Sequence, residues 1–173
     1  MSPISYPYLP EGRSIKYVPE DNEFIDAAKE FAAAFSSDRQ MPTGSVIVKD
    51  GEIIGRGANQ IALTNPKYIE LHRKYLCVRK LLHVPSGQKY WLCPGCASPS
   101  EHSERRAIRD AHQAGADTKG ADLYLWGHWW CCEPCWNAMI AAGIRDVYLL
   151  EGSEILFDKN NKENITGRQF ASH

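Results

Sequence analysis

Two short motifs of metal-binding residues, each at the expected start of a helix, constrain this chain more than any other feature. The first is His102-Ser103-Glu104 and the second is Cys132-Glu133-Pro134-Cys135. One imidazole and two thiolates are good zinc ligands, and three protein ligands leave a fourth position open, as in catalytic zinc sites. Cysteines three apart on a first helical turn lie on one face, so both sulfurs can reach one ion. A fold that uses all three ligands must bring the starts of two helices together.

Glu104 adds an acid–base group to this metal-binding pattern. It lies two residues beyond His102, close enough to border a metal ion without binding it. A carboxylate in that position can take a proton from the metal's water and return it to a leaving group. The two motifs together therefore indicate hydrolytic chemistry rather than a purely structural zinc site.

Composition restricts where such a chain works and what it binds. No apolar run is long enough to span a membrane, and residues 1–10 lack the pattern of a signal peptide. We therefore expect a cytoplasmic protein with reduced thiols and no membrane partner. Twenty basic residues oppose twenty-one acidic ones, for a net charge of -1. This balance argues against nucleic acid as the main partner, although one or two Arg or Lys residues can still hold a phosphate.

The order of the expected elements is typical of a partly parallel sheet. Periodicity and turn residues predict helices over 21–35, 69–82, 103–114 and 133–142, and strands over 45–48, 52–55, 122–126 and 146–150. The Asp50-Gly51 pair predicts a hairpin between the first two of these strands. The proline-rich range 1–20 is expected to form an extended arm, 21–157 the catalytic domain, and 158–173 a polar tail.

The pattern His-x-Glu followed by Cys-x-x-Cys resembles the signature of the zinc deaminases. Three further segments, 55–59, 77–93 and 141–148, resemble the cytidine and deoxycytidylate (dCMP) deaminase family, and the resemblance covers about residues 22–152. The chain departs from the family in four places. Ser103 replaces a common alanine, Arg105-Arg106 replaces a more neutral pair, Cys131 occupies the position of the usual proline, and 93–101 looks like an insertion.

The resemblance implies a fold and a role for each matching residue. The fold would be a three-layer α/β/α domain, with helices on both faces of a mixed five-stranded sheet whose first two strands form the hairpin. The metal ligands of one zinc ion would be His102, Cys132 and Cys135, and the proton shuttle would be Glu104. Substrate contacts would come from Asn59, the backbone N–H of Ser103 and, by stacking, Trp129.

The reaction implied by the resemblance is the conversion of dCMP and water to dUMP and ammonia. The same motifs also fit deamination of guanine, adenine or a pterin or flavin precursor. Two further alternatives are an enzyme that edits tRNA or DNA and a non-catalytic domain stabilised by zinc. The partner would be a small nucleotide or nucleobase. Members of the family usually associate with copies of themselves, so the resemblance also implies a homo-oligomer.

Several residues near these motifs leave alternatives open. Cys77, Cys93 and Cys96 either bind a second, structural zinc with a fourth ligand such as His72 or His83, or remain unbound thiols. A single four-cysteine site joining 93 and 96 to 132 and 135 is disfavoured, because the 35 intervening residues exceed the usual spacing. Three arginines, at 79, 105 and 106, either bind a phosphate or cover helix surface, while His128 and the nearby tryptophans are expected mainly to pack.

Overall fold

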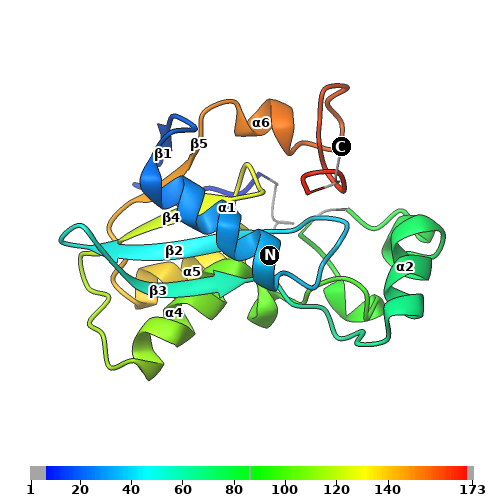
Figure 1. Ribbon diagram of the computed structural model, residues 1–173, viewed down its shortest axis with the longest axis horizontal. Coiled ribbons are helices and arrows are strands. Elements are labelled where there is room, and N and C mark those ends of the chain that lie inside the picture. The colour runs from blue at the N-terminus through cyan, green and yellow to red at the C-terminus, as the bar shows by residue number, and fades with distance from the viewer. Residues whose placement is uncertain (1–6, 86, 171–173) are drawn as a thin grey trace.

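The computed structural model describes residues 7–85 and 87–170, and its central element is a mixed sheet of five strands in the order β1-β5-β4-β2-β3. β2 (Gly44–Lys49) is antiparallel to both β3 (Glu52–Ala58) and β4 (Asp122–Trp126). β5 (Val147–Leu150) is parallel to β4 on one side and to β1 (Ile15–Val18) on the other. Helices cover both faces of this sheet (Figure 1), which confirms the predicted three-layer α/β/α fold.

The hairpin formed by β2 and β3 follows from its turn residues. Asp50 and Gly51 have φ angles of 52° and 83°, the positive values that a tight two-residue hairpin turn requires. The predicted hairpin is therefore confirmed, but its strands are the second and third along the chain rather than the first two.

The first strand comes from the range expected to be an extended arm. β1 pairs with β5 from Ile15↔Val147 to Val18↔Leu150, so this part of the range completes the sheet instead of standing apart from it. Without β1, the outer edge of β5 would expose unpaired backbone groups. At the other end of the chain, Ile165 and Phe170 pack against a hydrophobic core. The division into arm, domain and tail stays a prediction, although both flanking ranges contribute to the folded unit.

Two hydrophobic cores lie on opposite faces of the sheet. On one face α1 (Glu23–Phe35) and α6 (Ser153–Leu156) pack, and on the other α4 (Ser103–Gln113) and α5 (Glu133–Ala141) lie together (Figure 1). α1 begins at Asn22, whose side chain accepts hydrogen bonds from the N–H groups of Phe24 and Ile25, as a helix cap should. None of the helices in the described ranges is long and apolar enough to cross a bilayer.

The segment 61–101 lies beside this layered domain and has little regular structure. It contains α2 (Pro66–Lys74), α3 (Val78–Leu81) and two short 3-10 helices, η1 (Tyr90–Leu92) and η2 (Pro99–Glu101). The single helix predicted over 69–82 is wrong, because the chain leaves the helical conformation between α2 and α3. Cys77 is extended, with φ -99° and ψ 109°, and its sulfur lies 3.7 Å from that of Cys96.

Candidate active site

The first residues of α4 and α5 bring together the three residues predicted as zinc ligands. His102 and Cys132 immediately precede the two helices, and Cys135 lies in the first turn of α5. The Nδ1 atom of His102 is 3.4 Å from the sulfur of Cys132 and 3.5 Å from that of Cys135. A tetrahedral zinc ion with ordinary bond lengths would separate such donors by about 3.6 Å. The three side chains therefore fit one zinc ion and leave its fourth position open.

The orientation of His102 is fixed from its far side. Its Nε2 lies 3.2 Å from the carbonyl oxygen of Ala97, so Nε2–H donates there and Nδ1 keeps a lone pair for a metal ion. The Tyr90 ring and the imidazole pack nearly perpendicular to each other, with the ring centres 5.1 Å apart. Burial lowers the pKa of His102, but its hydrogen bond and charge interaction with Cys132 outweigh burial and raise that pKa overall.

The pKa values of the Cys132 and Cys135 thiols are shifted in opposite directions. A hydrogen bond from Cys135 lowers the pKa of Cys132 to about 6, and the neighbouring His102 adds to this effect. The same hydrogen bond, together with burial, raises the pKa of Cys135. Cys132 is therefore a thiolate at neutral pH, and binding of a metal ion would displace the remaining proton.

Glu104 lies in the same cavity but outside the group of three metal-binding side chains. It is only 5% exposed, and its Oε2 accepts a hydrogen bond of 3.1 Å from the hydroxyl of Ser103. That hydroxyl in turn accepts a 2.8 Å hydrogen bond from Ser45 in β2. The serine that replaces the family's alanine thus adds a donor that holds one oxygen of Glu104, a contact that the sequence pattern did not suggest.

Cys131, which takes the position of the usual proline, is a buried neighbour of Glu104 rather than a metal ligand. Its side chain is 1% exposed, and it is not part of the metal-binding group. Burial and the nearby carboxylate of Glu104 raise the pKa of this thiol well above its usual value. Cys131 therefore remains protonated beside Glu104.

Asn59 lines the cavity, yet most of its hydrogen-bonding capacity serves the neighbouring loop. Its Oδ1 accepts hydrogen bonds from the Ser36 hydroxyl at 2.6 Å and from the Thr43 N–H at 2.9 Å. Its Nδ2 donates to the carbonyl of Met41, which leaves one amide hydrogen for a substrate. Asn59 thus fixes the loop over 36–43 in addition to facing the cavity.

Trp129, which the resemblance implies as the residue that stacks on the base, does not line the cavity. Trp130 lines the cavity, whereas Trp129 packs against both hydrophobic cores. Gly127 precedes them with φ 93°, and a Cβ there would come 2.2 Å from the carbonyl oxygen of Pro42. A side chain could not adopt this turn without strain, so glycine is required where the chain leaves β4.

His128 lines the cavity, although the sequence analysis expected it mainly to pack. Its Nδ1 accepts hydrogen bonds from the backbone N–H groups of Trp129 and Trp130, at 3.0 and 3.3 Å. Burial, reinforced by the charge of His102, lowers the pKa of His128 to about 3. At neutral pH the ring is therefore uncharged and carries its proton on Nε2, where it can donate to a ligand.

Two cationic side chains, Arg79 and Lys159, also line the cavity. Arg79 lies over the Tyr90 ring at 4.1 Å and donates to the carbonyls of Gln88 and Pro85. Lys159 comes from the range expected to be a polar tail, and it makes no hydrogen bond or ion pair with another described residue. No signal in the sequence distinguishes it from other surface lysines, because only the return of the chain past α6 brings it here.

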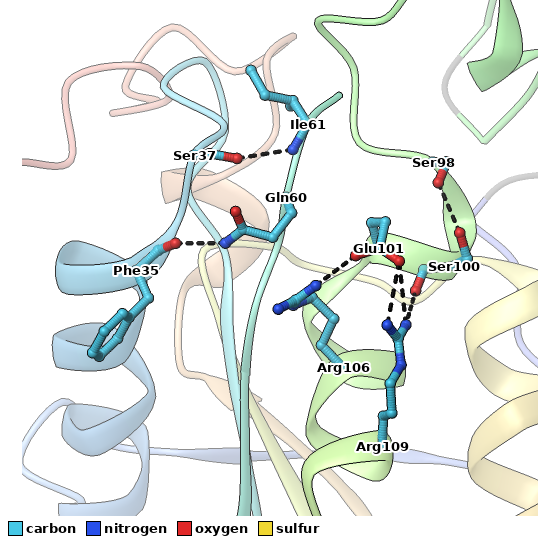
Figure 2. Close-up of polar contacts among 9 residues, drawn as sticks. All are labelled: Phe35, Ser37, Gln60, Ile61, Ser98, Ser100, Glu101, Arg106 and Arg109. Carbon is cyan, nitrogen blue, oxygen red and sulfur yellow. Dashed lines mark hydrogen bonds and ion pairs between the residues drawn. The ribbon is translucent and has the colours of Figure 1, made fainter. Parts of the chain in front are cut away.

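The other two candidate arginines, Arg105 and Arg106, do not line the cavity. Figure 2 shows Arg106 and Arg109 of α4 directed at the carboxylate of Glu101, with contacts of 2.5 and 3.3 Å. The Glu101 carbonyl also accepts a 3.0 Å hydrogen bond from the backbone N–H of Gln60. These contacts fix the backbone immediately before His102, so Arg106 stabilises the start of α4 instead of binding substrate.

A separate group of metal-binding side chains lies in the segment 61–101. Its members are His72, Cys77, Cys93 and Cys96, whose donor atoms all lie within 4.8 Å of one another. The cysteines at 93 and 96 therefore do not share a site with those at 132 and 135, as the spacing predicted. Of the two histidines considered as a fourth ligand, His72 is in the group and His83 is not.

Residues 18–151 match the family described as "Cytidine and deoxycytidylate deaminase zinc-binding region". The chain belongs to this family. It is accordingly a zinc-dependent deaminase, a hydrolase that acts on C–N bonds, and the fit of His102, Cys132 and Cys135 to one zinc ion agrees with that class. No curated protein sequence matches the chain significantly.

Solved structures of several deaminases resemble the chain. A dCMP deaminase from the cyanophage S-TIM5, in complex with dCMP and dUMP, is 19% identical over 76% of this chain and 82% of its own, with a TM-score of 0.48. A Thermotoga maritima diaminohydroxyphosphoribosylaminopyrimidine deaminase/reductase is 26% identical over 73% of this chain but only 28% of its own, with a TM-score of 0.44. Guanine deaminase from Bacillus subtilis is 23% identical over 79% of this chain and 70% of its own, with a TM-score of 0.41. Since these names refer to different substrates and no score reaches 0.5, the substrate must be argued from the cavity of this chain.

Proposed function

We propose that the protein deaminates dCMP to dUMP and ammonia in the cavity at the start of α4 and α5. The observation that carries this proposal is the presence of Arg79 and Lys159 in the cavity that contains the candidate zinc ligands and Glu104. A nucleoside monophosphate carries a charge of about -1.5 to -2 at neutral pH, whereas a nucleoside or free base carries none. Two cations that line the same cavity therefore favour a phosphorylated substrate.

In this proposal the zinc ion is held by His102, Cys132 and Cys135, and its chemistry is to polarise a water molecule and lower the pKa of that water. Glu104 would take a proton from the attacking water and deliver it to the ring nitrogen. It would then carry the proton of the newly added hydroxyl to the amino group, which leaves as ammonia while the ring carbonyl forms. The hydroxyl of Ser103 would hold the carboxylate in place through its 3.1 Å hydrogen bond. The cavity's neutral His128 and its Trp130 would contact the base, and Asn59 would offer its remaining amide hydrogen.

The proposal is tested by comparing dCMP with deoxycytidine, which lacks the phosphate, in wild-type protein and in Lys159→Ala. Hydrogen bonds to charged groups contribute about 1.5–3 kcal/mol, so kcat/KM for dCMP should fall roughly 10- to 150-fold in the variant. Activity on deoxycytidine should stay unchanged. The matched control is Lys162→Ala, which removes an exposed lysine three residues away that does not line the cavity.

Turnover of guanine, of adenosine in an RNA stem–loop, or of deoxycytidine as efficiently as dCMP would contradict the assignment of dCMP. Equal losses with dCMP and deoxycytidine in Lys159→Ala would contradict the role of Lys159 in phosphate binding. Ammonia release reports all of these reactions in one assay.

Two broader expectations accompany this function. A reducing compartment such as the cytoplasm would keep the thiols of the cavity available to zinc. We also propose a homo-oligomer. A second copy of the chain would contact the exposed apolar side chains of 61–101, among them Tyr75, Leu81 and Trp91. Light scattering on the purified protein measures its mass directly.

A further inference from the structure

The group formed by His72, Cys77, Cys93 and Cys96 has the geometry of a complete metal site. The sulfurs of Cys77 and Cys96 are 3.7 Å apart, and the Cys96 sulfur is 3.8 Å from Nε2 of His72. A tetrahedral zinc ion would separate two sulfurs by about 3.8 Å and a sulfur from a nitrogen by about 3.6 Å. Four protein donors also fill every position of a tetrahedron, as in structural rather than catalytic zinc sites.

The burial of this group is difficult to explain without a ligand. His72, Cys77 and Cys93 are between 2% and 7% exposed, and the described cysteines form no disulfide. Within the described residues, neither hydrophobic core includes any member of the segment 61–101. A segment of about forty residues with only short helices therefore lacks the apolar burial that would stabilise its fold. In other small, loop-rich units the binding of a metal ion supplies the free energy of folding.

The backbone around the group is shaped for close approach of its side chains. The N–H of Cys96 donates to the carbonyl of Cys93 at 3.0 Å, which closes the Cys-Pro-Gly-Cys turn. Gly95 lies in this turn, and a Cβ there would come 2.3 Å from the ring of His72. A glycine is therefore required if the imidazole is to reach the three sulfurs.

This turn leads directly to the candidate catalytic zinc ligands. Ala97 follows Cys96, and its carbonyl is the group that lies 3.2 Å from Nε2 of His102. His72 and Cys96 also line the active-site cavity. The two metal-binding groups are thus joined by one peptide unit and one hydrogen bond.

We propose that the group of His72, Cys77, Cys93 and Cys96 binds a second, structural zinc ion. By fixing the turn that ends at Cys96, this ion positions the Ala97 carbonyl, which holds His102 with Nδ1 directed at Cys132 and Cys135. The metal site itself is independent of the proposed substrate. The effect on His102 rests on the proposed role of that residue as a catalytic zinc ligand.

Binding through Nε2 of His72 has a consequence for its neighbour. The proton of the imidazole must then lie on Nδ1, which is 3.2 Å from Nε2 of the Gln40 side chain. Because Nδ1–H and the Gln40 Nε2 would then both be donors, we expect the Gln40 side chain to move away from Nδ1 in zinc-loaded protein while its Nε2 keeps the 2.9 Å hydrogen bond to the His72 carbonyl. A zinc-loaded crystal structure tests this movement together with the metal ligands.

The decisive measurement is the zinc content of the purified, zinc-reconstituted full chain. We expect two zinc ions per chain in wild-type protein and in the control His83→Asn, and one in His72→Asn. Both substitutions remove an imidazole from the same segment, but only His72 belongs to the group. Two ions in His72→Asn, or a single ion in wild-type protein that disappears in His102→Asn, would overturn the proposal.

Wild-type protein gives a second test if His72→Asn does not fold. Alkylation followed by peptide mass analysis should find Cys77, Cys93 and Cys96 protected in zinc-loaded protein and modified after treatment with a chelator. Modification of Cys96, the half-buried member, at the same rate with and without zinc would overturn the second site.

The positioning of His102 is tested by the rate at which the remaining zinc ion of His72→Asn transfers to a chelator. Loss of a group that orients a metal ligand typically weakens metal binding about 10- to 100-fold, so transfer should accelerate by a comparable factor relative to His83→Asn. An unchanged rate would overturn the positioning role. Metal counts and chelator kinetics require no substrate, so their failure is distinguishable from an incorrect assignment of dCMP.

Discussion

Gly57 of β3 lies against the first turn of α4, where the space between strand and helix holds no side chain. A Cβ at this position would come 2.1 Å from the carbonyl oxygen of Ser103 and 2.4 Å from the N–H nitrogen of Ala107. Non-bonded heavy atoms pack at about 3.5–4.0 Å, so Gly57→Ala must move the backbone of α4 by about 1 Å. Ser103 lies between His102 and Glu104, so this displacement falls on the active site.

The size of the effect follows from the type of strain. Overpacking of a filled interior costs about 1–3 kcal/mol of stability, and alanine recovers about 0.5–1 kcal/mol because glycine loses more freedom on folding. A misplacement of about 1 Å at a reaction centre costs roughly 100-fold in rate. We therefore expect Gly57→Ala to be modestly destabilised and to lose about 100-fold in kcat/KM.

Urea denaturation of the zinc-loaded protein measures the first quantity, and ammonia release measures the second. Gly55→Ala is the matched variant, because its Cβ would come 2.5 Å from the carbonyl of Ala107 and 2.8 Å from the Cβ of Ala111, one turn further along α4. It should be destabilised similarly but retain more activity. The reasoning is refuted if Gly57→Ala lies within about 0.5 kcal/mol of wild type and keeps its full activity.

Two more substitutions test individual groups of the cavity. Glu104→Gln should keep its zinc content, because Glu104 lies outside the metal-binding group. Its turnover should fall about 100- to 10,000-fold, because an acid–base catalyst is removed. Loss of zinc would show that Glu104 is a ligand. His128, with its pKa lowered from 6.5 to about 3, takes up a proton at higher pH in the unfolded chain than in the folded one. Its contribution to stability is therefore present above about pH 6.5 and is lost as the pH falls toward 3. His128→Asn should weaken less on acidification than wild-type protein in urea titrations, and an equal pH slope would contradict the lowered pKa.

The elements that local rules specify were predicted well. Asn22 caps the first long helix, and Asp50-Gly51 supplies the positive φ angles of the hairpin turn. The helices starting after His102 and Cys132 also begin where their motifs indicate. In each case a few neighbouring residues decide the conformation, so the order of these residues is sufficient information.

Contacts between distant segments decided the features that the sequence analysis missed. β1 exists because β5 offers it a parallel edge, about 130 residues later in the chain. The helix expected over 69–82 breaks at Cys77, whose sulfur lies beside that of Cys96 rather than on a continuous helix face. The periodicity of a segment's own residues reveals neither the pairing of β1 with β5 nor the contact of Cys77 with Cys96.

The residues of the candidate site also fall into those that local motifs predicted and those that tertiary packing placed. The two motifs, His-x-Glu and Cys-x-x-Cys, indicate the candidate zinc ligands and Glu104, and helix geometry places the two cysteines, three residues apart, on one face. Packing sets the paths of the loops, and these paths bring Trp130 rather than Trp129, together with Lys159, into the cavity. They also place His72 rather than His83 in the second metal-binding group. The sequence by itself therefore determined the class of chemistry, whereas the tertiary structure decided which side chains line the cavity, because residue spacing encodes local geometry but not which distant segments meet.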